Sequence, residues 1–139
     1  MNIKIKKLNS NAVIPFRAHF GDAGMDITAT SVIETEDYVE YGTGLAFEMN
    51  PGYMMLIFPR SSNSKKDLLL CNSVGILDSS YRGELKLRFK RTKQSDKTYS
   101  VGDKVGQIVI LPYPEINFIE VNELSETDRG EGGFGSTGK

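Results

Sequence analysis

Asp78 is the residue in this sequence whose surroundings most favour chemistry. It follows the apolar pair Ile76 and Leu77 and precedes Tyr81-Arg82-Gly83, a pattern typical of a strand end or a hairpin that faces a cleft. A carboxylate in a cleft can take a proton from water, which is general-base catalysis. An Asp followed by two serines is also common in turns, where it bonds to its own backbone. The residue by itself leaves both interpretations open.

A cation and a hydroxyl stand together at a second place in the sequence. Arg60 and Ser61 follow an apolar run, and Ser62 lies where a short helical turn over Ser61–Lys66 is predicted. This arrangement favours phosphate, because a guanidinium and the start of a helical turn both present N–H donors to an anion. Gln107 begins a further apolar run, where it is either a site residue or an ordinary surface glutamine.

The last eleven residues, Arg129–Lys139, combine glycines with hydroxyls, cations and one aromatic residue, and they show no apolar periodicity. Glycine lets backbone N–H groups converge on an anion, and Arg129 and Ser136 can donate to phosphate oxygens. Phe134, next to Gly135, could cover a flat base. We expect a flexible arm that closes over a ligand; a disordered terminus is the alternative.

The composition limits the kinds of partner. A length of 139 residues predicts one domain. The sequence has 17 Lys and Arg against 18 Asp and Glu, a net charge of −1, so we expect neither nucleic acid nor a membrane as a partner. No long apolar stretch is present, which predicts a cytoplasmic protein. One cysteine and one histidine predict neither a disulfide nor a zinc site.

Alternation of apolar and polar residues with period two dominates the sequence, as in Leu85-Lys-Leu-Arg-Phe89. No apolar periodicity of 3.6 persists for twelve residues, so at most one short helix is expected. We predict an all-β fold, a barrel or jelly-roll-like sandwich of short strands. Besides those near Ile3–Leu8 and Leu85–Phe89, the expected strands are Met25–Ala29, Tyr38–Glu40, Gly44–Met49, Tyr53–Phe58, Leu68–Asn72, Val105–Leu111 and Ile116–Val121. Ser61 or Ser62 is expected to cap the helical turn.

Five short segments combine glycine with polar residues. They are Ala23-Gly-Met-Asp-Ile-Thr-Ala29, Pro59-Arg-Ser-Ser62, Asn72-Ser-Val-Gly-Ile-Leu-Asp-Ser-Ser-Tyr-Arg-Gly-Glu-Leu85, Gly102-Asp-Lys-Val-Gly-Gln107 and the glycine-rich end. In this order and at these spacings they resemble the five motifs of the trimeric deoxyuridine triphosphatase (dUTPase) family. The resemblance extends from Ala23 to Gly138. It departs from the family pattern where the segment after Arg60 lacks a glycine and is one residue shorter.

The resemblance implies an enzyme that hydrolyses dUTP to dUMP and pyrophosphate, which limits uracil incorporation into DNA and supplies dUMP. Asp78 then activates the water that attacks the α-phosphorus, and Gln107 lies beside this water. Asn72 and backbone groups of the hairpin read the uracil edge, and Tyr81 packs on deoxyribose. The implied substrate-binding residues are Arg60, Ser61, Ser62, Asn72, Gly75, Ile76, Leu77, Tyr81, Lys86, Arg129, Phe134, Gly135 and Ser136. Lys86 fits a plain solvated strand face equally well.

The resemblance also implies partners. Mg²⁺ is expected as a cofactor held by the triphosphate and water rather than by protein ligands. Read from its own residues, Asp26 is expected to hold a neighbouring arginine or main-chain N–H groups, and its assigned role is orientation or contact with the metal's water. A homotrimer with shared active sites is implied, with a β domain over residues 1–128 and an arm over residues 129–139. Two alternatives remain open: a dCTP deaminase of the same fold, and a nucleotide-gated regulatory or binding protein.

Overall fold

The computed structural model describes residues 1–95 and 97–135, and within them the chain forms ten strands and one short 3-10 helix. The strands are β1 (Lys4–Lys7), β2 (Met25–Thr28), β3 (Ser31–Glu34), β4 (Val39–Gly42), β5 (Leu45–Glu48), β6 (Tyr53–Phe58), β7 (Leu68–Leu70), β8 (Gly75–Leu77), β9 (Lys86–Arg91) and β10 (Lys104–Pro112). The helix is η1 (Ser61–Lys65). The prediction of an all-β fold of short strands is confirmed. In residues 1–95 and 97–135 there is no helix with the length and apolar character needed to cross a membrane.

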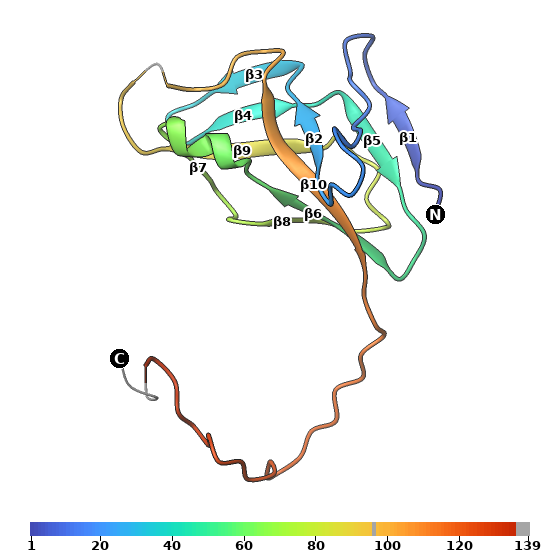
Figure 1. The fold of residues 1–139 in the computed structure, drawn as a ribbon, viewed down its shortest axis with the longest axis vertical. Helices are drawn as coiled ribbons and strands as arrows, with labels where there is room; N and C mark the ends of the chain where they lie inside the picture. Colours follow the sequence, from blue (N-terminus) through green and yellow to red (C-terminus); the bar gives the residue numbers. More distant parts are fainter. Residues whose placement is uncertain (96, 136–139) are drawn as a thin grey trace.

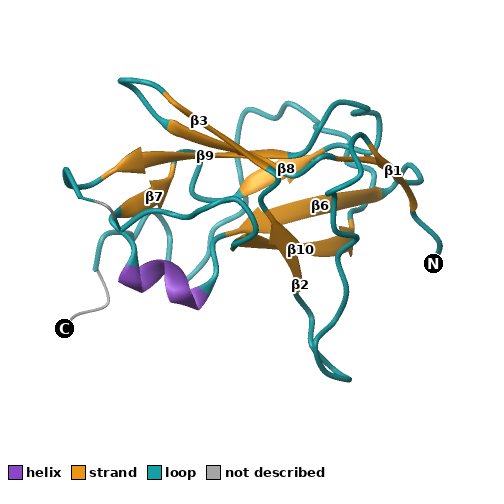
Figure 2. Ribbon diagram, turned by 90° about the horizontal axis from the view of Figure 1, so that it is seen from above, coloured by secondary structure: helices purple, strands orange, loops and turns teal. Residues whose placement is uncertain are grey.

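The strands form two four-stranded sheets and one two-stranded sheet (Figure 1). The first four-stranded sheet has the order β2-β10-β6-β8, and the second has the order β3-β4-β9-β7. Strands β1 and β5 pair antiparallel beside them. The helical turn η1 connects β6 of the first sheet to β7 of the second, as Figure 2 shows. Residues that precede and follow η1 therefore belong to different sheets.

Both four-stranded sheets bury side chains in one core. In β9 the residues alternate between exposed and buried, so that Leu87 and Phe89 face inward while Lys86 and Arg88 face outward, as period two requires. Phe89 packs edge-to-face against Tyr41, with ring centroids 5.7 Å apart. From the other sheet, Ile27, Met55 and Ile108 join the same cluster. This packed core fixes the strand ends from which the polar segments start.

The predicted helical turn is present, but its predicted cap is wrong. Arg60 occupies the N-cap position in an extended conformation, and no side chain there caps the helix. Its main-chain carbonyl accepts the N–H of Asn63 at 2.9 Å. Ser62 Oγ instead accepts from Arg60 Nη1 at 3.3 Å, because Ser61 and Ser62 already lie inside the turn. The shortened segment thus forms a complete 3-10 turn before β7.

The strand predicted over Ile116–Val121 is wrong, since no strand follows Pro112 in the part of the chain described. A strand needs a neighbour for its backbone hydrogen bonds, and the chain beyond β10 runs away from the sheets (Figure 1). Its apolar side chains are exposed, Phe118 at 95% and Leu124 at 87%. The expected boundary between a domain ending at residue 128 and an arm starting at residue 129 stays a prediction.

Candidate active site

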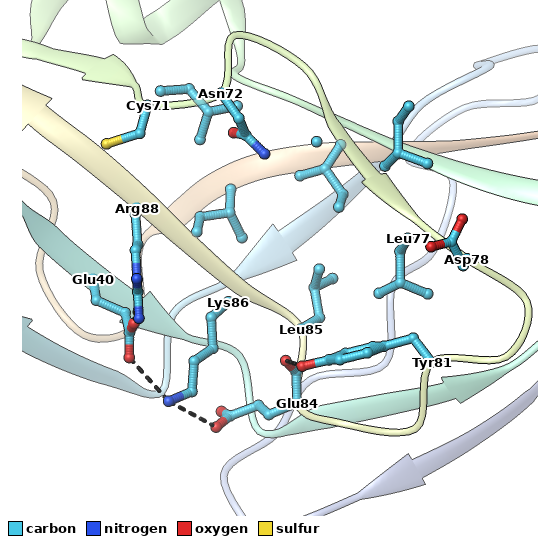
Figure 3. A pocket seen from close by; sticks show the side chains of 15 residues that line it. Glu40, Cys71, Asn72, Leu77, Asp78, Tyr81, Glu84, Leu85, Lys86 and Arg88 are labelled. Carbon is cyan, nitrogen blue, oxygen red and sulfur yellow. Dashed lines mark hydrogen bonds and ion pairs between the residues drawn. The ribbon is translucent and has the colours of Figure 1, made fainter.

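The hairpin expected around Asn72–Tyr81 is not formed, because β7 and β8 belong to different sheets, but its residues lie around one surface cavity of about 450 Å³ (Figure 3). The predicted site residues that line it are Asn72, Gly75, Ile76, Leu77, Asp78, Tyr81 and Lys86. They come from the turn between β7 and β8, from β8 itself, from the segment after it and from the start of β9. The fold therefore brings together the amide, the carboxylate and the aromatic ring that the sequence singled out.

Strand β8 places Asp78 at the edge of this cavity. Its Leu77 pairs with Met55 and its Gly75 with Ile57 on β6, so both residues are buried. Asp78 is the first residue after the strand and is exposed. Its side chain does not turn into the core, because the buried neighbour Leu77 already points there. A solvent-facing carboxylate at a cavity rim is accessible to water and ligand.

Asn72 lies over Gly75, and this contact requires glycine. A Cβ at residue 75 would lie 3.0 Å from Ile57 Cδ1 and 3.2 Å from the side-chain nitrogen of Asn72. Either distance is tighter than ordinary side-chain packing. Ser73, between them, has a φ of 57°, which turns the chain from β7 back toward β8. The missing side chain of Gly75 thus lets the Asn72 amide approach the cavity.

Tyr81 is 47% exposed and lines the same cavity. Its backbone N–H donates to the Asp78 carbonyl at 3.1 Å, which closes a turn between the two residues. Its hydroxyl donates to the Glu84 carbonyl at 3.2 Å. The ring lies against Gly83, where a Cβ would collide with it. Tyr81 is therefore held close to Asp78 by the turn and by its own hydroxyl.

A buried carboxylate that the sequence analysis did not identify forms part of the cavity wall. Glu40 on β4 is 5% exposed and accepts hydrogen bonds from Lys86 Nζ at 2.9 Å and Arg88 Nε at 2.7 Å (Figure 3). The hydrogen bond from Lys86, followed by that from Arg88, outweighs the effect of burial and lowers the pKa of the Glu40 carboxyl. The sequence offered one sign of this role: Glu40 is the single charged residue in the segment Val39–Phe47, which the structure shows to be buried.

The predicted phosphate-binding residues lie around a second cavity of about 300 Å³. Arg60, Ser61 and Gln107 line it together with Asp26 and Gly24. None of the residues that line the first cavity lines this one. In a single chain, the structure therefore separates the group around Asp78 from the group around Arg60.

Asp26 lies between two cations in this second cavity. Arg60 Nε donates to its Oδ1 and Lys104 Nζ to its Oδ2, both at 2.8 Å. Partial burial acts to raise the pKa of the Asp26 carboxyl, but the hydrogen bonds and charges of Lys104 and Arg60 together outweigh it and lower the pKa. Asp26 thus holds Arg60, one of the two kinds of partner that the sequence left open. The structure adds Lys104, which the sequence analysis did not identify.

Gln107 is positioned by the register of the first sheet. On β10 it lies opposite Asp26 of β2 and opposite Phe58 of β6. Its Nε2 donates to the Pro59 carbonyl at 3.1 Å, and its Oε1 lies where a Cβ at Gly24 would be. The side chain thus bridges the segments that carry Asp26 and Arg60, which explains why a polar residue precedes the apolar run Ile108–Leu111 within β10.

The predicted arm residues lie apart from both cavities in the described part of the chain. Arg129 Nε donates to the Gly132 carbonyl at 2.9 Å, and the Phe134 side chain is exposed. Gly135, with a φ of 88°, continues this turn. Ser136 lies outside the described residues. Residues 129–135, the part of the arm that the structure describes, thus line neither cavity.

The fold and the site together define an all-β sandwich protein in which the residues around Asp78 and those around Arg60 line two separate surface cavities. The sequence model of one family, dUTPase, matches residues 10–138. This match covers most of the chain, so the protein belongs to the dUTPase family.

Relatives support the assignment along the whole length. The deoxyuridine 5'-triphosphate nucleotidohydrolase of Nautilia profundicola is 41% identical over 142 residues, covering 100% of both chains. The structure of the Staphylococcus bacteriophage 80alpha dUTPase with dUPNHPP has a TM-score of 0.85 and 29% identity, covering 99% of each chain. A mutant dUTPase from phage phi11 of S. aureus, which coordinates a structural Mg(II) ion, has a TM-score of 0.77 and 26% identity over 91% of this chain and 100% of its own.

Proposed function

We propose that the protein hydrolyses dUTP to dUMP and pyrophosphate. One observation carries this proposal beyond family membership: the exposed carboxylate of Asp78 shares a cavity with the Asn72 amide and the Tyr81 ring. Asp78 takes a proton from a water molecule, and the resulting hydroxide attacks the α-phosphorus. The bond from this phosphorus to the bridging oxygen breaks, and pyrophosphate leaves with the bonding electrons.

The hairpin cavity fits a pyrimidine nucleoside. Uracil presents one N–H donor between two carbonyl acceptors, whereas cytosine presents an acceptor beside an amino group. Asn72 and backbone groups around Gly75–Leu77 pair with the uracil edge, and a mismatched base leaves buried polar groups without partners. Tyr81 packs on the deoxyribose and leaves no room for a 2′-hydroxyl. The half-exposed ring beside Asp78 supports this assignment.

The second cavity fits the triphosphate. Arg60 uses its Nε on Asp26, which leaves other guanidinium N–H groups for phosphate oxygens. Ser61 adds a hydroxyl, Ser62 supports Arg60, and Gln107 lies beside the attacking water. Lys86 remains in the first cavity, where Glu40 neutralises much of its charge. A contact between Lys86 and the nucleotide therefore adds less than a free lysine would.

Mg²⁺ fits this site when it is held by the nucleotide and water. Both oxygens of Asp26 already accept hydrogen bonds from cations, which supports an indirect contact through metal-bound water. Bound to the triphosphate, the ion supplies charge neutralisation during phosphoryl transfer. The structural Mg(II) ion of the phi11 relative is consistent with a divalent metal in the family.

A homotrimer completes the site. Asp78 and Arg60 line different cavities of one chain, and residues 129–135, the described part of the arm, line neither. We infer that one subunit supplies the phosphate-binding residues, a second the hairpin and a third the arm. The exposed apolar side chains between Ile116 and Leu124 support burial against other subunits.

The deciding experiment is product analysis with dUTP, dCTP, dTTP and UTP in the presence of Mg²⁺. We expect pyrophosphate from dUTP and much less from the other three nucleotides. Ammonia release from dCTP would instead support a deaminase of the same fold. Tight nucleotide binding without any product would support a regulatory protein, and either result would overturn the proposal.

A further inference from the structure

The segment from Asp78 to Leu85, which carries Tyr81, forms no strand of its own. Within it, the backbone bond from Tyr81 N–H to the Asp78 carbonyl closes only a local turn. A segment without ladder hydrogen bonds takes its position from the contacts at its ends. At its first end the segment continues from β8, and at its second end it reaches Glu84 and Leu85.

The second end is fixed to the connection between β4 and β5. Leu85 N–H donates to the Leu45 carbonyl at 2.8 Å, and the Leu85 carbonyl accepts from Thr43 Oγ1 at 2.7 Å. One residue earlier, Glu84 Oε1 accepts the backbone N–H of Gly44 at 2.8 Å. Two of these bonds belong to the main chain of Leu85, but the third depends on the side chain of Glu84.

The Glu84 carboxylate lies in space that Gly42 leaves open, and it binds the backbone of Gly44. A Cβ at Gly42 would collide with Glu84 Oε1. Gly44 has a φ of 66°, a conformation that favours glycine, and in this turn its N–H points to the carboxylate. The second carboxylate oxygen, Oε2, lies 3.9 Å from Lys86 Nζ. The carboxylate is therefore partnered on both sides.

Glu84 is also the residue that holds the Tyr81 ring. The Tyr81 hydroxyl donates to the Glu84 carbonyl at 3.2 Å, and Gly83 between them has no side chain to displace the ring. Figure 3 shows the Tyr81 side chain beside Glu84, with Lys86 and Glu40 continuing the line of charged groups. Because Glu40 is buried and binds Lys86 at 2.9 Å, the lysine beside Glu84 is itself held in place.

We propose that Glu84 is a positioning residue that, by binding Gly44, holds the Tyr81 ring in the cavity and so sets the preference for deoxyribose over ribose nucleotides. The inference rests on the proposed dUTP hydrolysis and on Tyr81 packing against the sugar. A ring excludes a 2′-hydroxyl only if it stays in place, since a small displacement opens the space that the hydroxyl needs. Loss of Glu84 therefore weakens discrimination through Tyr81 without removing a group that touches the reacting phosphorus.

The test compares Glu84→Ala with Glu84→Gln, using kcat and KM for dUTP and UTP. Alanine removes the acceptor for Gly44, and we expect the ratio of kcat/KM for dUTP to that for UTP to fall roughly tenfold. Most of that change should appear as a lower KM for UTP, because a displaced ring leaves room for the 2′-hydroxyl. Glutamine keeps an acceptor oxygen, so Glu84→Gln should recover most of the ratio that alanine loses. Glu48→Ala is the matched control, because Glu48 also pairs with a lysine, Lys4 at 2.7 Å, and lines neither cavity.

A second variant keeps the inference testable if Glu84→Ala does not fold. Tyr81→Phe removes only the hydroxyl that donates to the Glu84 carbonyl. It should lower the ratio of kcat/KM for dUTP to that for UTP and leave the melting temperature unchanged. An unchanged ratio in folded Glu84→Ala, or in Tyr81→Phe, would overturn the inference. Failure of the unmodified protein to hydrolyse dUTP would instead overturn the proposed function, so the two failures can be told apart.

Discussion

Arg60 and Asp26 meet across the first sheet, where Nε of the arginine donates to Oδ1 of the aspartate at 2.8 Å. Their side chains are only 31% and 24% exposed, so solvent screens the pair less than it screens a surface ion pair. The bond fixes the plane of the guanidinium and leaves its outer edge toward the second cavity. The carboxylate thus orients the arginine on which the phosphate-binding proposal depends.

Asp26→Asn should weaken this orientation. The amide cannot offer two carboxylate oxygens to Arg60 and Lys104, and a charge-assisted bond of this kind contributes about 1 to 2 kcal/mol. We expect kcat/KM for dUTP to fall about tenfold, measured by pyrophosphate release. Asp37→Asn is the control, since Asp37 is exposed and forms only a long ion pair, with its Oδ1 3.9 Å from Lys90 Nζ. Equal kinetics for both variants would contradict the role of Asp26.

Asp78→Asn should abolish turnover. The amide is isosteric with the carboxylate but cannot accept the proton of the attacking water, so we expect kcat to fall by about 10² to 10⁴. Nucleotide affinity, measured by calorimetry with dUTP, should stay within a few-fold of that of the unmodified protein. Hydrolysis at the normal rate by this variant would show that another group is the base.

Mixed oligomers should test whether sites are shared. Asp78→Asn and Arg60→Ala should each be inactive alone, but co-expressed they should regain about a quarter of the activity if different subunits supply the two residues at random. The control is Asp78→Asn co-expressed with Asn72→Ala. Both changes lie in the segment that lines the first cavity, so neither chain supplies an intact copy of it and no intact site can form. Absence of recovery in the first mixture would mean that one chain supplies both residues.

Deletion of residues 129–139 should cripple turnover without unfolding the protein. No residue of the two four-stranded sheets is removed, so the circular dichroism spectrum and the sedimentation coefficient of the oligomer should be unchanged. Arg129→Ala should show part of the same loss in kcat, because it removes one cation that binds phosphate. Unchanged kinetics after deletion would mean that the arm does not close over the nucleotide.

The Glu40 carboxylate should make stability depend on pH. Its pKa is lower in the folded protein than in the unfolded chain, so its contribution is complete above the unfolded value of about 4.5 and is lost as the pH falls through the folded value. Glu40→Gln should lower the free energy of unfolding at pH 7 by about 1 to 2 kcal/mol. It should also flatten the acid side of the pH profile obtained by denaturant titration.

Glu36→Gln is the control for this measurement, because Glu36 is exposed in the loop before β4. We expect its free energy of unfolding to stay within about 0.5 kcal/mol of that of the unmodified protein. If the free energy of unfolding of Glu40→Gln falls at acid pH as much as that of the unmodified protein, the loss of stability must come from other carboxylates.

The sequence by itself determined the all-β fold and much of the strand pattern. Alternation in Leu85–Phe89 and the apolar run of Tyr53–Phe58 are local signals, because a strand exposes and buries neighbouring residues in turn. Strand β3 escaped prediction because all four of its residues are exposed and carry little alternation. The segment Ile116–Val121 was wrongly predicted as a strand because it is rich in apolar residues. In the described part of the chain it has no neighbouring strand with which to pair.

Tertiary structure alone decided which of the candidate residues meet. Asn72, Asp78 and Tyr81 are close in sequence, so one hairpin could be expected to gather them. Asp26 on β2 binds two residues that are distant in sequence: Arg60, which follows β6, and Lys104, which lies on β10. Only the antiparallel register of β2, β10 and β6 brings these three residues together. Asp78 and Arg60 follow β8 and β6, which are antiparallel neighbours in one sheet, so the two residues leave this strand pair at opposite ends. Contacts between distant segments depend on strand pairing and core packing, which no short stretch of sequence encodes.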